Sequence, residues 1–182
     1  MDAGQTLLEP EELLRMPDGD HYELIDGVPK EKPMGAESDS IAIGLGSLLT
    51  AFVKAKKLGL TFGAQTGYQC FPGRPKRVRM PDVSFVAKGR LPDDKPPKGY
   101  VSIAPDLAVE VLSPGELAEE LAEKLADYRS AGIRLVWVVS PATRMVAIRR
   151  ADGTLAELDE SGTLSGEDVL PGFTCTVAEL FV

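Results

Sequence analysis

The stretch APDLAVEVLSPGE, residues 104–116, decides the fold around which the rest of the chain is arranged. Its central run from Leu107 to Leu112 is apolar apart from one carboxylate, Glu110. A continuous apolar run of this length, with proline on either side, is typical of a strand that is buried on both faces of a sheet. Because burial of an unpaired carboxylate costs several kcal/mol, the sequence predicts a compensating cation beside Glu110, either a basic side chain or a metal ion.

The composition indicates one domain, residues 1–182. Hydrophobic residues make up 43% of the chain, which is enough for a core at this length. The net charge of −8 excludes a protein that coats polyanions generally, and the single histidine, His21, excludes zinc sites built from several histidines. Two cysteines without CxxC spacing favour a reduced, cytoplasmic protein. The longest uncharged stretch, 40–53, is shorter than the about 20 residues of a membrane span, so we expect no membrane partner.

The N-terminal third predicts a helix, a hairpin and a longer helix. Residues 6–16 favour a short helix, and 21–33 favour two short strands joined by a tight Asp-Gly turn. The longer helix is expected to have its cap at Ser38 or Asp39 and to run to about residue 58. Its expected apolar face consists of Ile41, Leu45, Leu48 and Phe52.

The remaining two thirds predict a sheet and one further helix. Strands are expected at about 60–70, 79–87 and 105–112, and two more within 133–150. Ser113 is the expected N-cap of a helix that runs to Ser130, with Glu116 completing a capping box. This order of elements predicts an α/β fold with a mixed central sheet flanked by helices, an additional N-terminal helix and hairpin, and a β-rich C-terminal tail.

Three carboxylates interrupt strands that otherwise have the composition of core. Glu23 lies between apolar neighbours, Asp82 begins the run PDVSFVA, and Glu110 lies mid-strand. Each also has a purely structural interpretation: Glu23 on an edge strand facing water, Asp82 capping a turn after proline, and Glu110 in an ion pair. Together, two or three carboxylates without histidine are the oxygen ligands that Mg²⁺ or Mn²⁺ prefers.

A lysine on the second long helix is the expected partner of these carboxylates. Lys124 lies on the same helical face as Tyr128, and this face is expected to pack on the sheet, whereas Glu119, Glu123 and Asp127 are expected to be exposed. Lys124 either extends its ammonium to water or meets Glu110 and Asp82. In the second case it stays charged and stabilises negative charge, which suits phosphoryl chemistry.

The segment from residue 74 to 98 carries eight basic and three acidic side chains on an otherwise acidic protein. A local basic patch can bind a phosphate backbone, and on this basis the candidate nucleic-acid contacts are Arg74, Lys76, Arg77 and Arg79. The alternative is a solvated loop punctuated by proline and glycine.

Five motifs in order resemble the Uma2 family (domain of unknown function 820), a divergent branch of the PD-(D/E)xK nuclease-like fold. These are YELIDG, PDVSFV, APDLAVEVLSP, the helix with Lys124 and Tyr128, and AGIRLVWVVSP. The resemblance spans about residues 7–181 and implies a restriction-endonuclease-like core and a Mg²⁺-dependent endonuclease site.

By motif, the resemblance makes Glu23 the upstream acidic residue, Asp82 the aspartate of the PD motif and Glu110 the acidic residue of the third motif. Leu112 stands where the family fold usually has a lysine, and Lys124 is the lysine displaced to the helix. Where relatives often have a histidine near the start of the first long helix, this chain has AESDSI.

Three functional hypotheses follow. The first is a Mg²⁺-dependent (or Mn²⁺-dependent) endonuclease that hydrolyses phosphodiester bonds, with DNA as the expected nucleic acid. The second is a catalytically inactive nuclease-fold protein that binds nucleic acid or assembles as a homo-oligomer. The third treats the carboxylates and Lys124 as a buried salt-bridge network with a structural role.

Overall fold

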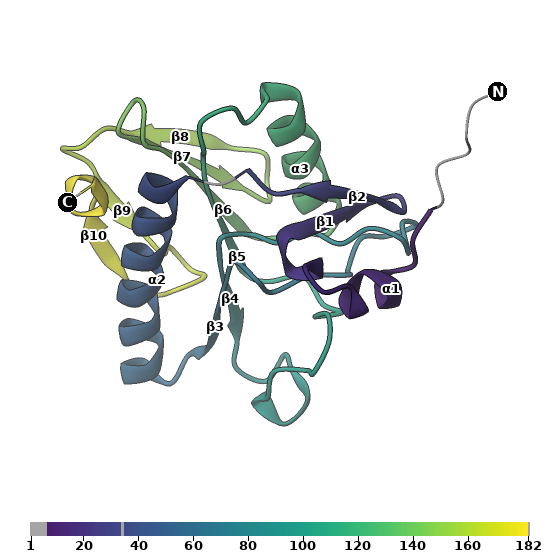
Figure 1. Ribbon diagram of the computed structural model, residues 1–182. Helices are drawn as coiled ribbons and strands as arrows, with labels where there is room; N and C mark the ends of the chain where they lie inside the picture. The colour runs from purple at the N-terminus through teal and green to yellow at the C-terminus, as the bar shows by residue number, and fades with distance from the viewer. Residues whose placement is uncertain (1–6, 34, 182) are drawn as a thin grey trace.

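The computed structural model describes residues 7–33 and 35–181, and its core is a six-stranded mixed sheet (Figure 1). The helices are α1 Pro10–Arg15, α2 Ala36–Lys56 and α3 Ala118–Ser130, with short 3₁₀ turns at Gly19–His21, Pro92–Asp94 and Val177–Phe181. The strands of the main sheet are β3 Gly59–Gly63, β4 Val83–Ala87, β5 Leu107–Val111, β6 Leu135–Ser140, β7 Met145–Arg150 and β8 Leu155–Leu158. Two small sheets pair β1 Tyr22–Ile25 with β2 Val28–Glu31 and β9 Thr163–Ser165 with β10 Thr174–Thr176.

The strands of the main sheet follow chain order from β3 to β8, and β5 with β6 is the parallel pair among them. Parallel neighbours need a crossover connection, and α3 provides it by running back across the sheet between these two strands. The fold is therefore the expected α/β arrangement, with a mixed sheet at its centre.

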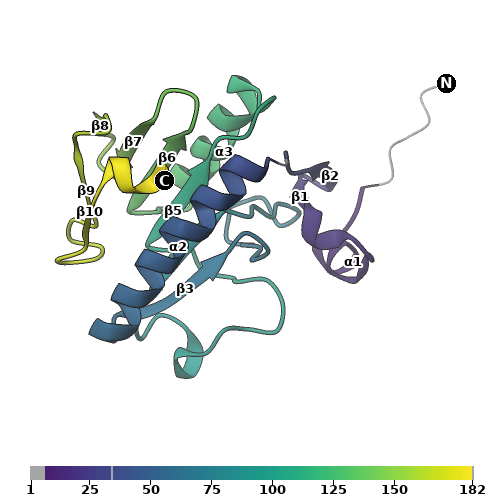
Figure 2. The same cartoon turned by 60° about the vertical axis from the view of Figure 1, so that its left-hand side comes forward.

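The predicted burial of β5 on both faces is confirmed. Side chains alternate along a strand, so Leu107, Val109 and Val111 join the core cluster under α2, whereas Ala108 joins the cluster under α3. Figure 2 shows α2 lying across one face of the sheet, with the C-terminal elements beside it. Glu110 shares the face of Ala108, so its carboxylate points into the layer beneath α3.

The N-terminal hairpin is joined to the segment that precedes β4. Asp26 and Gly27 form its turn with φ of 51° and 91°, the left-handed pair that tight hairpins need. The backbone N–H of Leu24 donates to the carbonyl of Val78 at 3.0 Å, and Val78 donates back at 2.9 Å. This pairing brings Glu23 beside the residues that lead into β4.

The structure corrects the predicted start and face of α2. Gly35 is its N-cap, and the Ser38 hydroxyl donates to the Gly35 carbonyl at 2.9 Å while it bonds the Ser113 hydroxyl at 2.7 Å. Leu48 is 42% exposed. Because successive residues of a helix are about 100° apart, the row that faces the sheet continues from Leu45 to Leu49 and Val53, and Leu48 lies outside it. The buried row on the sheet consists of Ile41, Ala42, Leu45, Leu49 and Val53.

Further boundaries differ from the prediction. α3 begins at Ala118 with Leu117 as its N-cap, because Gly115 has a φ of 87° that a right-handed helix does not allow. The predicted cap at Ser113 is therefore wrong. β3 and β4 are shorter than expected, because the chain between them forms loops in which Tyr68 bridges to Arg79 and Val101.

Within the described residues, α2 is long and apolar enough to cross a membrane by length and composition alone. A helix that packs on a core sheet passes the same test, and the buried row of α2 lies in the main core.

Candidate active site

Glu110 lies at the centre of a buried polar cluster, and two side chains of α3 supply its partners. Lys124 Nζ lies 3.0 Å from Glu110 Oε2, and the Tyr128 hydroxyl donates to Glu110 Oε1. Lys124 and Tyr128 are one helical turn apart, so both reach down from the same face. The predicted packing of this face on the sheet is confirmed, and the cation beside Glu110 is a lysine.

Glu23 joins the same cluster from the hairpin. Its Oε1 accepts a hydrogen bond of 2.8 Å from the Met80 backbone N–H and lies 3.8 Å from Lys124 Nζ. Its Oε2 lies 2.9 Å from Arg79 Nη1. Glu23 is 4% exposed, so the edge-strand interpretation is wrong. We call Glu23, Glu110, Lys124 and Tyr128 the Lys124 network.

Burial and charge shift the pKa values within the Lys124 network in opposite directions. Burial raises the pKa of Glu110 to about 7; the charge of Lys124 lowers it, and the carboxylates of Asp82 and Glu23 raise it. Burial also acts to raise the pKa of Glu23, but Lys124 and Arg79 together hold that pKa below its usual value. For Lys124, burial is outweighed by its carboxylate neighbours, so its pKa is raised and the ammonium stays charged.

Two of the four predicted nucleic-acid contacts lie inside the protein. Arg77 and Arg79 are 1% and 2% exposed, and both pair with the carboxylate of Asp127, at 2.6 Å from Arg77 Nη1 and 2.7 Å from Arg79 Nε. This placement contradicts the prediction that they bind phosphates. Arg74 and Lys76 are partly exposed, and Lys76 pairs with Glu9 at 2.5 Å.

Asp127 is a further correction, because it was expected to be exposed and is 3% exposed. It lies three residues after Lys124 on α3, at the border of the buried face. Three arginines from the segment before β4 reach it, Arg77 and Arg79 closely and Arg74 at 3.5 Å, so the basic residues of that segment neutralise an internal carboxylate.

Among the described residues, Asp82 has no hydrogen bond or ion pair to the Lys124 network, and it lies at the wall of a cavity of about 390 Å³. Its Oδ2 accepts a hydrogen bond of 2.8 Å from the Val111 backbone N–H, and its own N–H donates to the Val109 carbonyl at 3.0 Å. Its Oδ1 lies 3.1 Å from Lys32 Nζ. We call this space the Asp82 cavity; of the described residues that line it, Lys32 is the one lysine or arginine.

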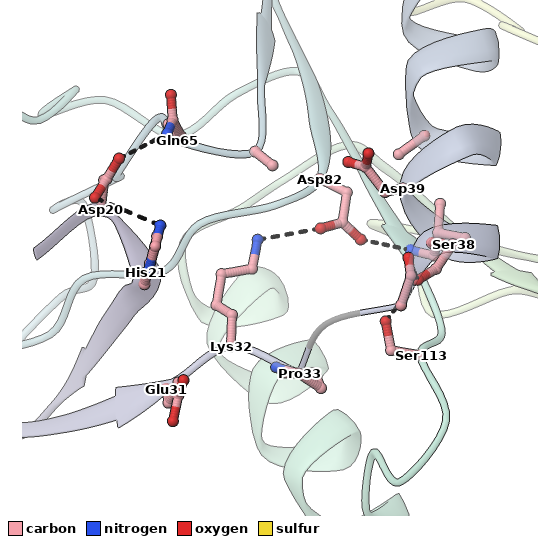
Figure 3. A pocket seen from close by; sticks show the side chains of 15 residues that line it. Asp20, His21, Glu31, Lys32, Pro33, Ser38, Asp39, Gln65, Asp82 and Ser113 are labelled. Atoms are coloured by element: carbon pink, nitrogen blue, oxygen red, sulfur yellow. Dashed lines mark hydrogen bonds and ion pairs between the residues drawn. The ribbon is translucent and has the colours of Figure 1, made fainter. Parts of the chain in front are cut away.

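The Asp82 cavity is formed where several parts of the chain meet, among them the segment after β3 with Gln65 (Figure 3). The hairpin and the turn before it contribute His21 and Lys32, the first turn of α2 contributes Ser38 and Asp39, and Ser113 follows β5. Figure 3 shows the Lys32 ammonium pointing at Asp82, between the hairpin and the start of α2. The positions at which the family resemblance placed Ser38 and Asp39 in place of a histidine therefore border this cavity.

The three carboxylates predicted to hold one metal ion do not form a single open site. Over residues 7–33 and 35–181, no group of three or more histidine, cysteine, aspartate or glutamate side chains is placed to hold a metal ion. Glu110 and Glu23 are closed off by Lys124, Tyr128 and Arg79.

At Asp82, in contrast, the chemistry of the donor atoms fits a divalent cation. The Lys32 ammonium is a cation held by two oxygen atoms, Asp82 Oδ1 at 3.1 Å and the Met80 carbonyl at 2.7 Å. Carboxylate and carbonyl oxygens are the ligands that Mg²⁺ takes, and Mg²⁺ usually binds one or two carboxylates and keeps several waters.

Sequence reasoning missed Lys32 because it lies just beyond the end of β2, about 50 residues from both of its partners. The motif VPKEKP contains two lysines, and strand alternation alone does not tell which one turns inward. Lys30 pairs with Glu120, whereas Lys32 reaches Asp82.

Comparison with known proteins agrees with this architecture. The Uma2 family, described as "Putative restriction endonuclease", matches residues 10–178. A solved structure described as "a putative nuclease belonging to DUF820", from Anabaena variabilis ATCC 29413, has a TM-score of 0.79 and 20% sequence identity, over 96% of this chain and 97% of that chain. A search of curated proteins found no match. The predicted nuclease-like fold is confirmed.

Proposed function

The chain belongs to the Uma2 family, and from this membership and the Asp82 cavity we propose that it hydrolyses phosphodiester bonds in nucleic acid, in a Mg²⁺- or Mn²⁺-dependent reaction with DNA as substrate. The observation that carries the proposal is the position of Asp82. Its carboxylate pairs with the Lys32 ammonium at the wall of a cavity of about 390 Å³, on a fold shared with a solved structure described as "a putative nuclease".

Asp82 and the Met80 carbonyl are the groups that would hold the metal ion, with Glu110 behind them. When bound, a divalent cation polarises a phosphate group and lowers the pKa of a coordinated water. The residues of the chain provide the remainder. The backbone N–H of Val111 orients Asp82 through its Oδ2, so that Oδ1 is directed toward the cavity side.

In this proposal Lys124 does not contact the substrate and acts through Glu110. Lys124 is 6% exposed, and its ammonium lies among the carboxylates of Glu110, Glu23 and Glu116 at 3.0–3.9 Å. It therefore fixes Glu110 in place and supplies a positive charge behind the site, and it does not touch a phosphate group. Polar contacts with substrate fall to the cavity wall, where Lys32, His21 and Ser38 lie.

The test is cleavage of linear and branched DNA by the wild type and by Asp82→Asn, in Mg²⁺ and in Mn²⁺. We expect the wild type to cleave and Asp82→Asn to lose at least about a hundredfold in rate, because it removes the charged cation ligand. Asp168→Asn is the matched control, since Asp168 is exposed and pairs with Arg134 at the surface. Equal cleavage by wild type and Asp82→Asn would exclude Asp82 from the reaction.

A second candidate function is a nuclease-fold protein without turnover that binds nucleic acid or assembles with itself. The closed Lys124 network favours it, because Lys124 and Arg79 already neutralise Glu110 and Glu23. In that case the wild type binds DNA without cleaving it, and neither Mg²⁺ nor Asp82→Asn changes the affinity.

A further inference from the structure

We infer that Lys32 is a built-in competitor of the divalent cation at Asp82. This inference rests on the proposed function, because it concerns the same cation position. In the structure the ammonium of Lys32 takes the two oxygen atoms that a metal ion would use, Asp82 Oδ1 and the Met80 carbonyl. Metal binding therefore requires that Lys32 leaves.

The backbone of the hairpin holds Lys32 in this position. Its N–H donates to the His21 carbonyl at 2.9 Å, one residue beyond the last pair of β1 with β2. The side chain is 15% exposed, so it is enclosed along its stem and reaches its partners with the ammonium. The cation position is thus occupied by a part of the protein itself, without any ion from solution.

Charge explains why the ammonium and a divalent cation cannot share the position. Each of the carboxylates of Glu23, Asp82 and Glu110 already lies within 3.1 Å of a cationic nitrogen in the described structure. The cationic side chains are Lys32, Arg79 and Lys124. A metal ion added at Asp82 brings two further positive charges within a few ångströms of the ammonium, where like charges repel strongly. The ion therefore binds only as Lys32 moves out.

The Asp82 cavity gives the displaced ammonium somewhere to go. Lys32 lines this cavity of about 390 Å³, so rotation of its side chain takes the charge into open space. There the ammonium can pair with a phosphate group of the substrate. The metal ion and the phosphate then favour each other's binding, because each relieves the charge that the other creates.

The test is calorimetric titration of Mn²⁺ into the wild type, Lys32→Met and Lys30→Met. Lys32→Met keeps the length of the apolar stem and removes the charge. Lys30→Met is the matched control, because Lys30 lies two residues earlier and pairs with Glu120 at the surface. We expect Lys32→Met to bind Mn²⁺ about tenfold or more tightly than wild type, and Lys30→Met to bind like wild type.

Two further variants keep the result interpretable. Lys32→Gln replaces Lys32→Met if melting curves show that the latter does not fold. Combining Lys32→Met with Asp82→Asn should abolish the gain, which assigns the bound ion to Asp82.

The outcomes separate the two proposals. If the wild type binds Mn²⁺ and the folded Lys32 variants bind it equally or more weakly, the competitor role is wrong and the metal-dependent nuclease stands. A gain that persists when Asp82 is also changed overturns the competitor role as well. If neither the wild type nor a Lys32 variant binds Mn²⁺, metal dependence itself is wrong and the competitor role is wrong with it.

Discussion

Lys32 and Lys124 form ion pairs of nearly identical length in very different surroundings. Each ammonium lies close to one carboxylate oxygen, at 3.1 Å for Lys32 with Asp82 and at 3.0 Å for Lys124 with Glu110. Both lysines also line one small space of about 20 Å³ between them. Only Lys32 borders the large Asp82 cavity, whereas Lys124 is enclosed beneath α3. The comparison teaches that access, more than contact distance, separates a charge that can be exchanged from one that cannot.

The difference in solvent access between the two ion pairs should change how much each contributes to the free energy of unfolding. Removal of one partner from a buried pair leaves an uncompensated charge with no water to solvate it. Removal of a partner at a cavity wall leaves a carboxylate that water can reach. The Lys124 network should therefore behave as part of the fold, and the Lys32–Asp82 pair as part of a binding site.

The largest effect is expected on removal of the enclosed lysine. Lys124→Met should destabilise the protein by about 3–5 kcal/mol at pH 8, because Glu110 and Glu23 lose their shared cation. Urea denaturation measures the change, with Lys30→Met as a surface control that should cost less than about 1 kcal/mol. A Lys124 variant within about 1 kcal/mol of wild type would contradict the structural role of the network.

The next effect concerns the pH dependence of the same network. The pKa of Glu110 is raised to about 7 in the folded protein, mainly by burial, whereas the unfolded chain titrates near about 4.3. The folded state therefore holds this proton more tightly, and the associated stability is present below about pH 4.3 and is lost as the pH rises to about 7.

Glu110→Gln cannot ionise, so its free energy of unfolding relative to wild type should rise between about pH 4.5 and 7.5, by an amount on the order of 3 kcal/mol. Urea denaturation of both proteins across this range tests the prediction. Parallel stability curves for the two proteins would show that Glu110 does not titrate there.

The smallest effect is expected on the open side. Lys32→Met should change the free energy of unfolding without metal by about 1 kcal/mol or less, because the Asp82 carboxylate remains hydrogen-bonded to Val111 and borders the cavity. The same urea experiment at pH 8 measures it. A loss as large as that of Lys124→Met would mean that both lysines are structural and that the comparison between them fails.

Much of the fold could be predicted because its signals are local. The alternating environment of β5 and the shared face of Lys124 and Tyr128 follow from the periods of strand and helix, and they led directly to the buried pair with Glu110. The hairpin followed from the Asp26-Gly27 turn. Element boundaries were less predictable, because the side chain of Ser113 bonds Ser38, which lies 75 residues away in the chain.

The candidate site could be predicted only in part, because charge in a sequence does not reveal burial. Arg77 and Arg79 lie in a basic segment of the kind that binds phosphates, yet both are buried in ion pairs with Asp127. Asp82 was found from its motif, but its ion pair with Lys32 was not predicted. The two residues are 50 positions apart in the chain, and no helix or strand period links segments that far apart.

The two hydrogen bonds that tie Asp82 to β5 connect the site to the correctness of folding. Its N–H and its carboxylate extend the antiparallel pairing of β4 with β5 by one residue, through Val109 and Val111. A slip of this pair by one residue would turn every side chain of β4 to the opposite face. A misaligned chain would thus not present the Asp82 carboxylate to the cavity, so the cation binding proposed at Asp82 would also report correct strand alignment in refolding experiments.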